Sequence, residues 1–346
     1  MQNLLVPSRS RNSKRSSKKS CRAKSKFRIF TNKVRSKNMA VSPVIRFTKV
    51  AKHFGDCVSC RELNFEVAGG SIHAIVGENG AGKSTAMKML FGLYKLTSGL
   101  IELNNQTINF DSPIDATAAG IGMVHQHFML APSLSALDNV LLFQKGIKGF
   151  QRLQRADNQK RLQTLAQKFG FQIDWNKAVA DLSVGTQQRI EILKILAQGA
   201  RVLILDEPTA VLTPQETSEL FANLRMLRAE GCTILLVTHK LKEVLAIADA
   251  VTVLRAGVSI ATKPIAATSA QDIAELMVGR KVIDWSTQHR EQMADPKILL
   301  ETKSLSCAPQ FGSLHDVAIK VHTGEIVGIA GVEGNGQDQL IQALLD

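Results

Sequence analysis

A glycine-rich stretch at residues 77–85 has the residue types and spacing of a loop that binds phosphate groups. Its glycines let backbone N–H groups wrap a phosphate chain, and the lysine after the last glycine neutralises the outer phosphates. The serine that follows the lysine is a ligand for Mg²⁺ in such loops. The residues that we expect to bind the nucleotide here are Gly77, Glu78, Asn79, Gly80, Ala81, Gly82, Lys83, Ser84 and Thr85.

Apolar patterns on both sides of this loop predict the elements that position it. Residues 72–76 precede the loop as a buried strand, and residues 85–92 follow it with the composition of a helix. A strand, a loop and a helix in this order bring a helix N-terminus, with its unpaired N–H groups, next to the phosphates. The context therefore favours a phosphate site over a chance match to the pattern.

Two carboxylates follow a second apolar run. Residues 202–205 are entirely apolar and lead into Asp206 and Glu207, the pattern of a buried parallel strand that delivers acidic groups at its carboxyl end. We expect Asp206 to bind Mg²⁺ together with Ser84. Glu207 is expected to act as the general base that deprotonates an attacking water. The alternative is a solvated acid pair at the start of a helix.

A histidine and a glutamine follow two further apolar stretches. His239 comes after residues 233–238 and is expected to reach the outer phosphate as a donor or a hinge, although a single histidine there is more often structural. Gln126 is expected to touch the metal or the attacking water through its side-chain amide. Its neighbours His125 and His127 lack the carboxylate or cysteine company of a metal site.

Residues 182–188 (Leu-Ser-Val-Gly-Thr-Gln-Gln) open a further helical pattern, with Ser183 at a capping position. Together with the phosphate loop and the Asp-Glu strand, in this order, they resemble the signature of the ABC ATPase family, and the resemblance covers residues 44–280. It implies an α/β fold, a P-loop NTPase core with a mixed sheet, an antiparallel β subdomain and a helical subdomain at about residues 130–181. It also implies ATP and Mg²⁺ as cofactors.

In ABC ATPases each ATP lies between the phosphate loop of one domain and the signature helix of another. By this resemblance Phe54 would stack on the adenine, unless it is an ordinary buried aromatic residue. Ser183, Gly185 and Gln187 would bind the nucleotide of the opposite domain. Gln126 would link the site to a permease.

Two positions depart from the general family pattern. Thr213 stands in the loop after the catalytic acid where most members have an aspartate, which weakens any inference about signalling between sites through that loop. Val184 replaces a glycine of the signature and remains compatible with a helix N-terminus that donates N–H groups.

Residues 122–130 and 206–216 look most similar to tandem ATPases of bacterial simple-sugar and nucleoside importers, with the nucleoside type the nearest. This resemblance implies integral-membrane permease subunits and a substrate-binding protein as partners. It implies a peripheral position on the cytoplasmic face of the cell membrane. No nucleic acid is expected as a partner.

A second copy of the loop begins 254 residues after the first, so that Gly77 aligns with Gly331 and the strand before the loop aligns with residues 326–330. This repeat predicts a linker over 281–297 and the truncated start of a second ABC domain over 298–346. In the second copy Gln337 and Asp338 replace the lysine and serine, so an ammonium is lost and a carboxylate faces the phosphates.

From this comparison we expect a weak or inert second site. The signature helix of the second half is missing, so the chain alone should hydrolyse ATP slowly, and its last apolar residues should lack a domain that buries them.

The net charge of +13 is confined to the N-terminal residues. Residues 1–38 carry thirteen Lys or Arg and no Asp or Glu, so residues 39–346 hold thirty charges of each sign and are neutral. We expect a disordered basic tail over 1–38. It has three interpretations: a non-native extension upstream of Met39, which we favour, an arm for an anionic partner, or an organelle transit peptide.

The five cysteines are odd in number and scattered, which indicates a reducing, cytosolic compartment rather than a disulfide framework. Cys57 and Cys60 form a C-x-x-C pair, but no second pair or histidine set completes a metal site. No apolar run approaches the length of about 18 residues that a membrane span requires.

Two other functions remain open from the sequence. A soluble tandem ABC protein that acts on ribosomes or nucleic acid would use the basic tail as its contact arm. The short, mixed stretch over 279–295 argues against it, because such proteins tend to have a long charged helical linker. A nonfunctional fragment would leave every residue role unchanged.

Overall fold

A computed structural model describes residues 43–126, 128–142, 155–280, 297–307, 314–331 and 335–345. The basic tail predicted over residues 1–38, and the predicted linker over 281–297 apart from its last residue, lie outside these described residues.

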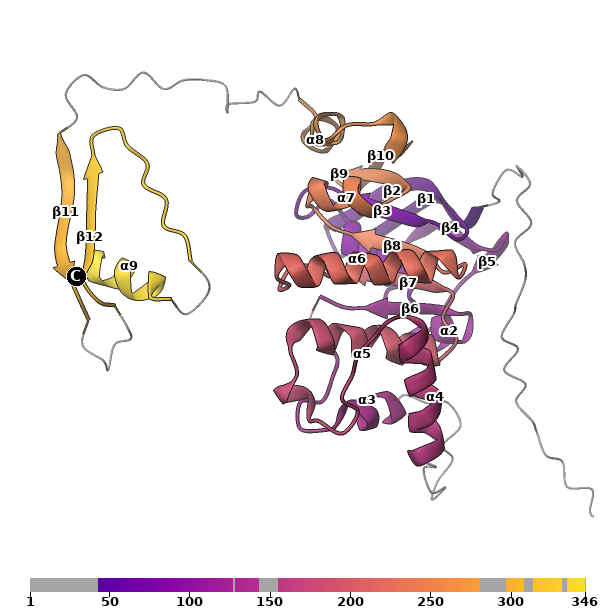
Figure 1. Cartoon of the computed structure of the whole chain (residues 1–346). Coiled ribbons are helices and arrows are strands. Elements are labelled where there is room, and N and C mark those ends of the chain that lie inside the picture. Colours follow the sequence, from indigo (N-terminus) through magenta and orange to yellow (C-terminus); the bar gives the residue numbers. More distant parts are fainter. Residues whose placement is uncertain are drawn as a thin grey trace, which may run out of the picture.

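One ten-stranded mixed sheet forms the centre of residues 43–280 (Figure 1). Its strand order is β5-β4-β1-β2-β10-β9-β3-β8-β7-β6. The strands are β1 (Pro43–Phe54), β2 (Cys57–Ala68), β3 (Ile72–Val76), β4 (Ser98–Leu103), β5 (Gln106–Ile108), β6 (Ile121–Val124), β7 (Val202–Asp206), β8 (Thr233–Val237), β9 (Ala250–Arg255) and β10 (Val258–Pro264).

The parallel part of the sheet contains the strands that the apolar runs predicted. β3 lies between β9 and β8, and β8, β7 and β6 follow as parallel neighbours. Every residue of β3, β7 and β8 is buried, because helices cover both faces of a parallel sheet. Their carboxyl ends therefore meet at one edge, as ligand sites in such sheets do.

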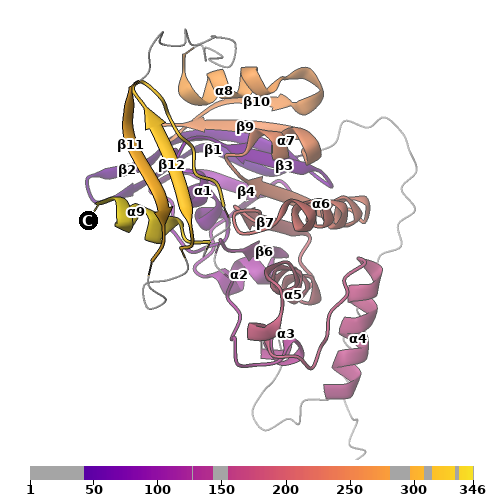
Figure 2. The same cartoon turned by 60° about the vertical axis from the view of Figure 1, so that its left-hand side comes forward.

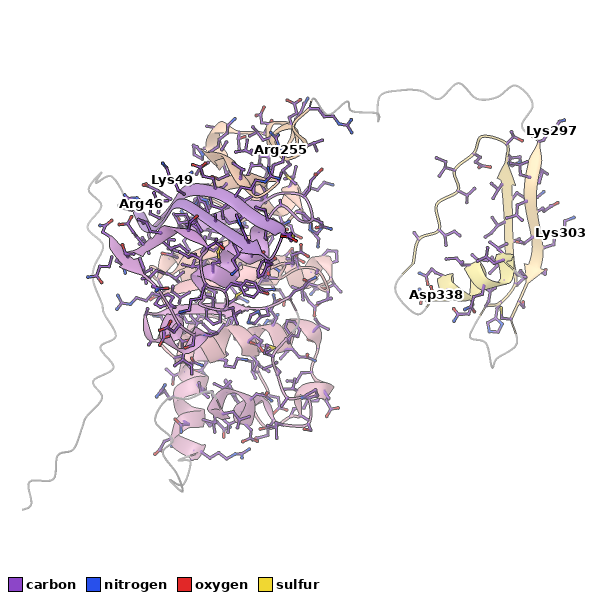
Figure 3. All side chains as sticks on the ribbon, turned by 180° about the vertical axis from the view of Figure 1, so that it is seen from behind. Arg46, Lys49, Arg255, Lys297, Lys303 and Asp338 are labelled. Carbon is purple, nitrogen blue, oxygen red and sulfur yellow. The ribbon has the colours of Figure 1, made fainter. Side chains whose placement is uncertain are left out.

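The antiparallel part consists of β1, β2, β4 and β5, paired in the order β5-β4-β1-β2. Arg46 on β1, labelled in Figure 3, ties three of these strands together through ion pairs with Glu66 at 2.6 Å and Glu102 at 3.2 Å. The predicted mixed sheet with an antiparallel β part is confirmed.

The helices of this unit are α1 (Lys83–Leu90), α2 (Pro113–Ala118), α3 (Ala136–Leu142), α4 (Arg155–Lys168), α5 (Val184–Ala197), α6 (Pro214–Ala229), α7 (Leu241–Ile247) and α8 (Ala270–Val278), with short 3₁₀ turns at Val179–Asp181 and Ile265–Ala267. α3 and α4 lie together beyond β6 in both Figure 1 and Figure 2, and both pack on α5. Trp175 is buried in the hydrophobic core that these helices share with the sheet. Among the described residues no helix is long and apolar enough to cross a membrane.

Side-chain caps determine where α5 and α6 begin. Ser183 caps α5 by accepting a hydrogen bond from the Thr186 amide at 3.3 Å, as its position in the sequence predicted. Thr213 caps α6 and forms a reciprocal capping box with Glu216. The threonine that departs from the family pattern therefore has a local structural role.

The C-terminal segment repeats the opening elements of the first unit. β11 (Ile298–Leu305) and β12 (Val317–His322) form an antiparallel pair, and α9 (Gln337–Leu345) begins 254 residues after α1. Asp338 lies in the first turn of α9 (Figure 3). These are the counterparts of β1, β2 and α1.

The strand expected at residues 326–330 does not form, which corrects the comparison with β3. A parallel strand needs hydrogen-bonding neighbours, and β3 obtains them from β8 and β9. No strand pairs with 326–330 among the described residues. Ile326 in this segment is accordingly 76% exposed, and Leu345 at the end of α9 is 81% exposed.

Candidate functional site

A cavity of about 380 Å³ opens at the carboxyl edge of the parallel strands. The phosphate loop follows β3, Gln126 follows β6 and Glu207 follows β7, so three strands deliver residues to one place. The residues that line the cavity are Ser59, Asn79, Gly80, Ala81, Gly82, Lys83, Ser84, Thr85, Gln126 and Glu207.

The loop needs its glycines for two different reasons. Gly80 and Gly82 have φ angles of 82° and 96°, in the left-handed region that side chains disfavour. A Cβ atom on Gly77 would lie 2.3 Å from the carbonyl oxygen of Leu254, so only glycine fits against β9. The loop then runs directly into α1 at Lys83.

The positively charged side chain of Lys83 lies inside the loop. Its Nζ donates to the carbonyl oxygens of Gly77 at 2.9 Å and Glu78 at 3.0 Å, and the residue is buried. Burial lowers the pKa of Lys83, and the charges of Glu207 and Asp206 oppose that shift. An anionic ligand would supply the ammonium with the counter-charge that burial makes favourable.

Ser84 and Asp206 place two hard oxygen ligands side by side. The Ser84 hydroxyl donates to Oδ1 of Asp206 at 3.1 Å. Burial raises the pKa of Asp206, and the bond from Ser84 opposes this. A hydroxyl and a carboxylate oxygen at this separation fit the preference of Mg²⁺ for oxygen ligands and for few protein ligands.

Asp206 and Glu207 point to different partners, as their spacing suggested. Oε1 of Glu207 lies 3.1 Å from Nδ1 of His239, while Asp206 bonds Ser84. The side chain of Glu207 is 20% exposed and lines the cavity, whereas that of His239 is 50% exposed and reaches the cavity edge through its contact with Glu207. Glu207 also has a φ of 48°, an unusual value for a residue with a side chain.

The segment after Gln126 is held by a buried ion pair on α5. Nζ of Lys194 lies 2.8 Å from the Glu191 carboxylate, and both side chains are almost fully buried. Glu191 accepts from the Met129 amide at 2.8 Å, and Lys194 donates to the Met129 carbonyl at 3.2 Å. His125 packs edge-on against Phe91, whereas His127 lies outside the described residues. No group of three or more metal-binding side chains occurs in the described part of the chain.

Six predicted nucleotide-binding residues do not line the cavity: Gly77 and Glu78 at the start of the phosphate loop, and Phe54, Ser183, Gly185 and Gln187 outside the loop. Phe54 is 41% exposed and packs edge-on against Tyr94 with ring centroids 5.1 Å apart. Ser183, Gly185 and Gln187 lie at the N-terminus of α5, where the Gly185 amide donates to Oε1 of Glu216 at 3.1 Å. In this chain they have partners other than the phosphate loop.

Ser59 is a cavity residue that sequence reasoning missed. Its hydroxyl lies 2.8 Å from the Thr85 hydroxyl, and β2 packs so closely that a Cβ on Gly82 would meet the Ser59 carbonyl oxygen at 2.8 Å. The C-x-x-C spacing gave no hint of this contact. Its two cysteines differ in environment, because Cys57 is exposed while Cys60 is buried and burial raises its pKa to about 11.

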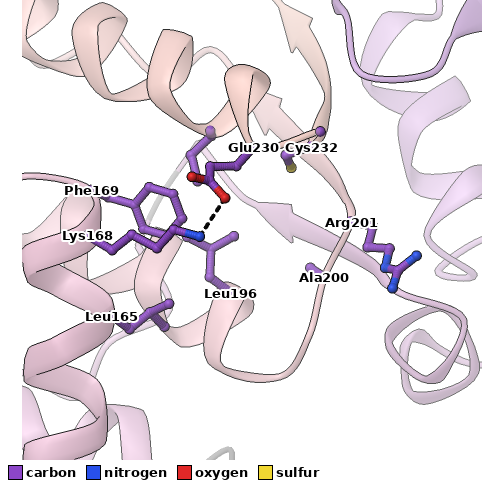
Figure 4. A pocket seen from close by; sticks show the side chains of 10 residues that line it. Leu165, Lys168, Phe169, Leu196, Ala200, Arg201, Glu230 and Cys232 are labelled. Carbon is purple, nitrogen blue, oxygen red and sulfur yellow. Dashed lines mark hydrogen bonds and ion pairs between the residues drawn. The ribbon is translucent and has the colours of Figure 1, made fainter. Parts of the chain in front are cut away.

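A second cavity, of about 460 Å³, lies at the amino ends of β7 and β8 (Figure 4). An ion pair between Lys168 on α4 and Glu230 after α6 crosses it at 2.5 Å. None of the predicted nucleotide, metal or catalytic residues lines this cavity. The candidate site is therefore the smaller cavity around the phosphate loop.

Comparison with known proteins identifies sequences with the same pattern. Residues 60–210 match the family model described as ABC transporter. A nucleoside import ATP-binding protein of Lactococcus lactis is 44% identical over 309 residues, covering 88% of this chain and 60% of the relative. A guanosine import ATP-binding protein of Bacillus subtilis is 43% identical, covering 87% and 59%, and a glucose import ATP-binding protein of Haloferax volcanii is 42% identical, covering 88% and 60%. The chain thus spans about 60% of the length of these relatives.

Solved structures share the fold. An ATP-binding cassette of an ABC transporter in its ADP conformation matches with a TM-score of 0.59 at 22% identity, covering 68% of this chain and 95% of that one. The protein cbiO1 of Clostridium perfringens, described as part of an ABC transporter complex, matches with a TM-score of 0.56 at 28% identity, covering 64% and 89%.

Proposed function

We propose that this chain contains an ATP-binding domain of the ABC transporter family, and that it binds and hydrolyses ATP to drive an importer of nucleosides or simple sugars. The observation that carries the proposal is the convergence of loop, acids, glutamine and histidine at one sheet edge. The import functions named for its relatives supply the substrate class.

In the proposed reaction the loop amides and Lys83 bind the phosphates of ATP. The ammonium exchanges its two carbonyl acceptors, which lie at 2.9 and 3.0 Å, for phosphate oxygens. Ser84 and Asp206 hold Mg²⁺, which when bound neutralises charge on the phosphate oxygens. These steps need no movement of the sheet, because Ser84 at the start of α1 and Asp206 at the end of β7 are already in contact.

Glu207 and His239 form the proposed hydrolytic pair. Glu207 accepts the proton of the attacking water as the new bond to the γ-phosphorus forms and the bond to the β–γ bridging oxygen breaks. His239, 3.1 Å away, orients this carboxylate and donates toward the γ-phosphate. Gln126 faces the same cavity and contacts the water or the metal through its amide.

We propose that residues 44–280 form the first ABC domain and that residues 298–346 belong to a second one. Phe54 then stacks on adenine, while Ser183, Gly185 and Gln187 bind the nucleotide held by the second domain. Ser183, Gly185 and Gln187 lie outside the phosphate-loop cavity, which supports their assignment to the nucleotide of the other domain.

The second phosphate loop is proposed to be weak or inert. Asp338 stands in the first turn of α9, where Ser84 stands in α1, and its negative charge opposes a phosphate.

Permease subunits and a substrate-binding protein complete the proposed importer. The chain then lies on the cytoplasmic face of the membrane, with the permease bound near Gln126 and residues 130–181.

Titration of the purified chain with MgATP tests the first step. Removal of the Lys83 ammonium by Lys83→Ala should raise the dissociation constant at least about 10-fold, since a charge-assisted hydrogen bond contributes about 1.5–3 kcal/mol. Lys168→Ala, which removes an exposed lysine in an ion pair, is the matched control. Equal ATP affinity in wild type and Lys83→Ala would refute the assignment.

Transport in cells tests the rest of the proposal. The complete protein, with its permease, should take up a radiolabelled nucleoside or sugar, and Glu207→Gln should abolish uptake while ATP stays bound. Glu230→Gln provides a control at a carboxylate remote from the cavity. Undiminished uptake in the Glu207→Gln protein would exclude the proposed role.

A further inference from the structure

The turn that carries Glu207 is strained and therefore needs support from its surroundings. Its φ of 48° belongs to the left-handed region, which costs a residue with a side chain about 1–2 kcal/mol. Backbone bonds hold it on two sides: the Glu207 amide donates to the Val237 carbonyl at 2.9 Å, and the Ala210 amide donates to the Glu207 carbonyl at 3.2 Å. Strain of this kind persists only where neighbouring groups determine the conformation.

Two residues beyond Glu207, a buried threonine makes a further tie. Thr209 is 2% exposed, and its hydroxyl lies 2.7 Å from both carboxylate oxygens of Glu243 on α7. Nζ of Lys240 donates to the Thr209 carbonyl at 3.0 Å. The segment after β7 is thus attached to the start of α7.

The same carboxylate reaches the segment after β8. The hydroxyl of Thr238, the residue before His239, lies 3.4 Å from Oε2 of Glu243. Nζ of Lys240, the residue after His239, lies 3.2 Å from Oε1 of the same group. Glu243 therefore contacts the neighbours of His239 on both sides and the strained turn of Glu207.

We propose that Glu243 is a positioning residue, whose carboxylate sets the distance and orientation of Glu207 relative to His239. The inference rests on the proposed ATP hydrolysis and assigns no contact between Glu243 and the nucleotide. Glu243 receives bonds from two hydroxyls and one ammonium, and an ionised carboxylate can accept all of them at once. Its side chain is 12% exposed, so water cannot readily replace these partners.

Single-turnover hydrolysis by the full chain, together with a MgATP titration, tests the proposal. Glu243→Gln keeps the size of the side chain but presents an N–H₂ group to donors, and it should slow turnover about 10-fold or more, since small misplacements near reacting groups have effects of up to about 10²-fold. The dissociation constant for MgATP should stay within about twofold. Glu230→Gln, in an exposed ion pair, should change neither value.

A double-mutant cycle separates positioning from general stability. Thr209→Val should slow turnover like Glu243→Gln, Thr209→Ser should restore it, and the double variant should be no slower than the slower single variant, because both changes break one connection. Circular dichroism verifies folding, and Thr209→Ser keeps the test informative if Thr209→Val unfolds.

Loss of the Glu243 role and loss of ATP hydrolysis as such give different results. Wild-type turnover in Glu243→Gln, or multiplicative losses in the double variant, would overturn the positioning role alone. A wild-type chain that neither binds nor hydrolyses MgATP would overturn the proposed function and this inference with it.

Discussion

The buried ion pair on α5 gives the most quantitative prediction about this protein. Glu191 and Lys194 are 3% and 7% exposed, and together they hold both backbone groups of Met129, three residues after Gln126. Lys194→Met removes the ammonium but keeps a side chain of similar length. The carboxylate of Glu191 then remains buried with only the Met129 amide as a donor among these partners.

The expected loss follows from that uncompensated charge. Removal of one partner from a buried ion pair destabilises a protein by about 3–5 kcal/mol. The double variant Glu191→Gln/Lys194→Met carries no buried charge, and the glutamine Oε1 can still accept from the Met129 amide. Only the Met129 carbonyl loses its donor, at a cost of about 1–3 kcal/mol, so the double variant should be more stable than Lys194→Met by about 2 kcal/mol.

Urea unfolding monitored by tryptophan fluorescence measures both values. Trp175 is 5% exposed in the core beside α5, and Trp285→Phe removes the second tryptophan of the chain. Lys168→Met is the matched control, because its ion pair is exposed and should contribute less than about 1 kcal/mol. A double variant that is no more stable than Lys194→Met would refute the reasoning.

Three further predictions concern stability. His73 is buried in β3, and burial lowers its pKa from 6.5 to about 4. Between these pH values the unfolded chain therefore binds a proton that the folded chain does not. The free energy of unfolding should fall by up to about 3 kcal/mol as the pH drops from 6.5 to 4. Urea midpoints of wild type and His73→Gln across this range check it, and parallel curves would contradict it. Gly122→Ala places a Cβ 1.8 Å from Cγ2 of Ile195, so the free energy of unfolding should fall by about 1–3 kcal/mol. Thermal unfolding measures this loss, and a second change, Ile195→Ala, should restore part of it. An unchanged melting temperature in Gly122→Ala would contradict the clash. Thr213→Ala should cost about 1 kcal/mol through loss of the α6 cap while Thr213→Ser costs less, and equal losses would exclude the hydroxyl as the cause.

Local patterns in the sequence predicted the parallel strands and the loop between them. The apolar runs that became β3, β7 and β8 are fully buried, and a fully buried strand must be apolar along its whole length. Glycine spacing located the phosphate loop, because glycine alone tolerates both left-handed angles and the close approach of Leu254. The acids at the end of β7 could then be placed at the same edge.

Local patterns in the sequence did not predict contacts between distant segments. Ser59 reaches the loop from β2, and Glu243 reaches Thr209 across 34 residues, through side-chain bonds that leave no periodic signal. The repeat also failed as a guide at residues 326–330, because glycine and apolar spacing specify a strand only where neighbouring strands can accept its hydrogen bonds. The sequence alone thus determined which residue types could bind a nucleotide and in what order they occur. The tertiary structure alone decided which side chains hold them in place, since those distances depend on how the strands and helices pack.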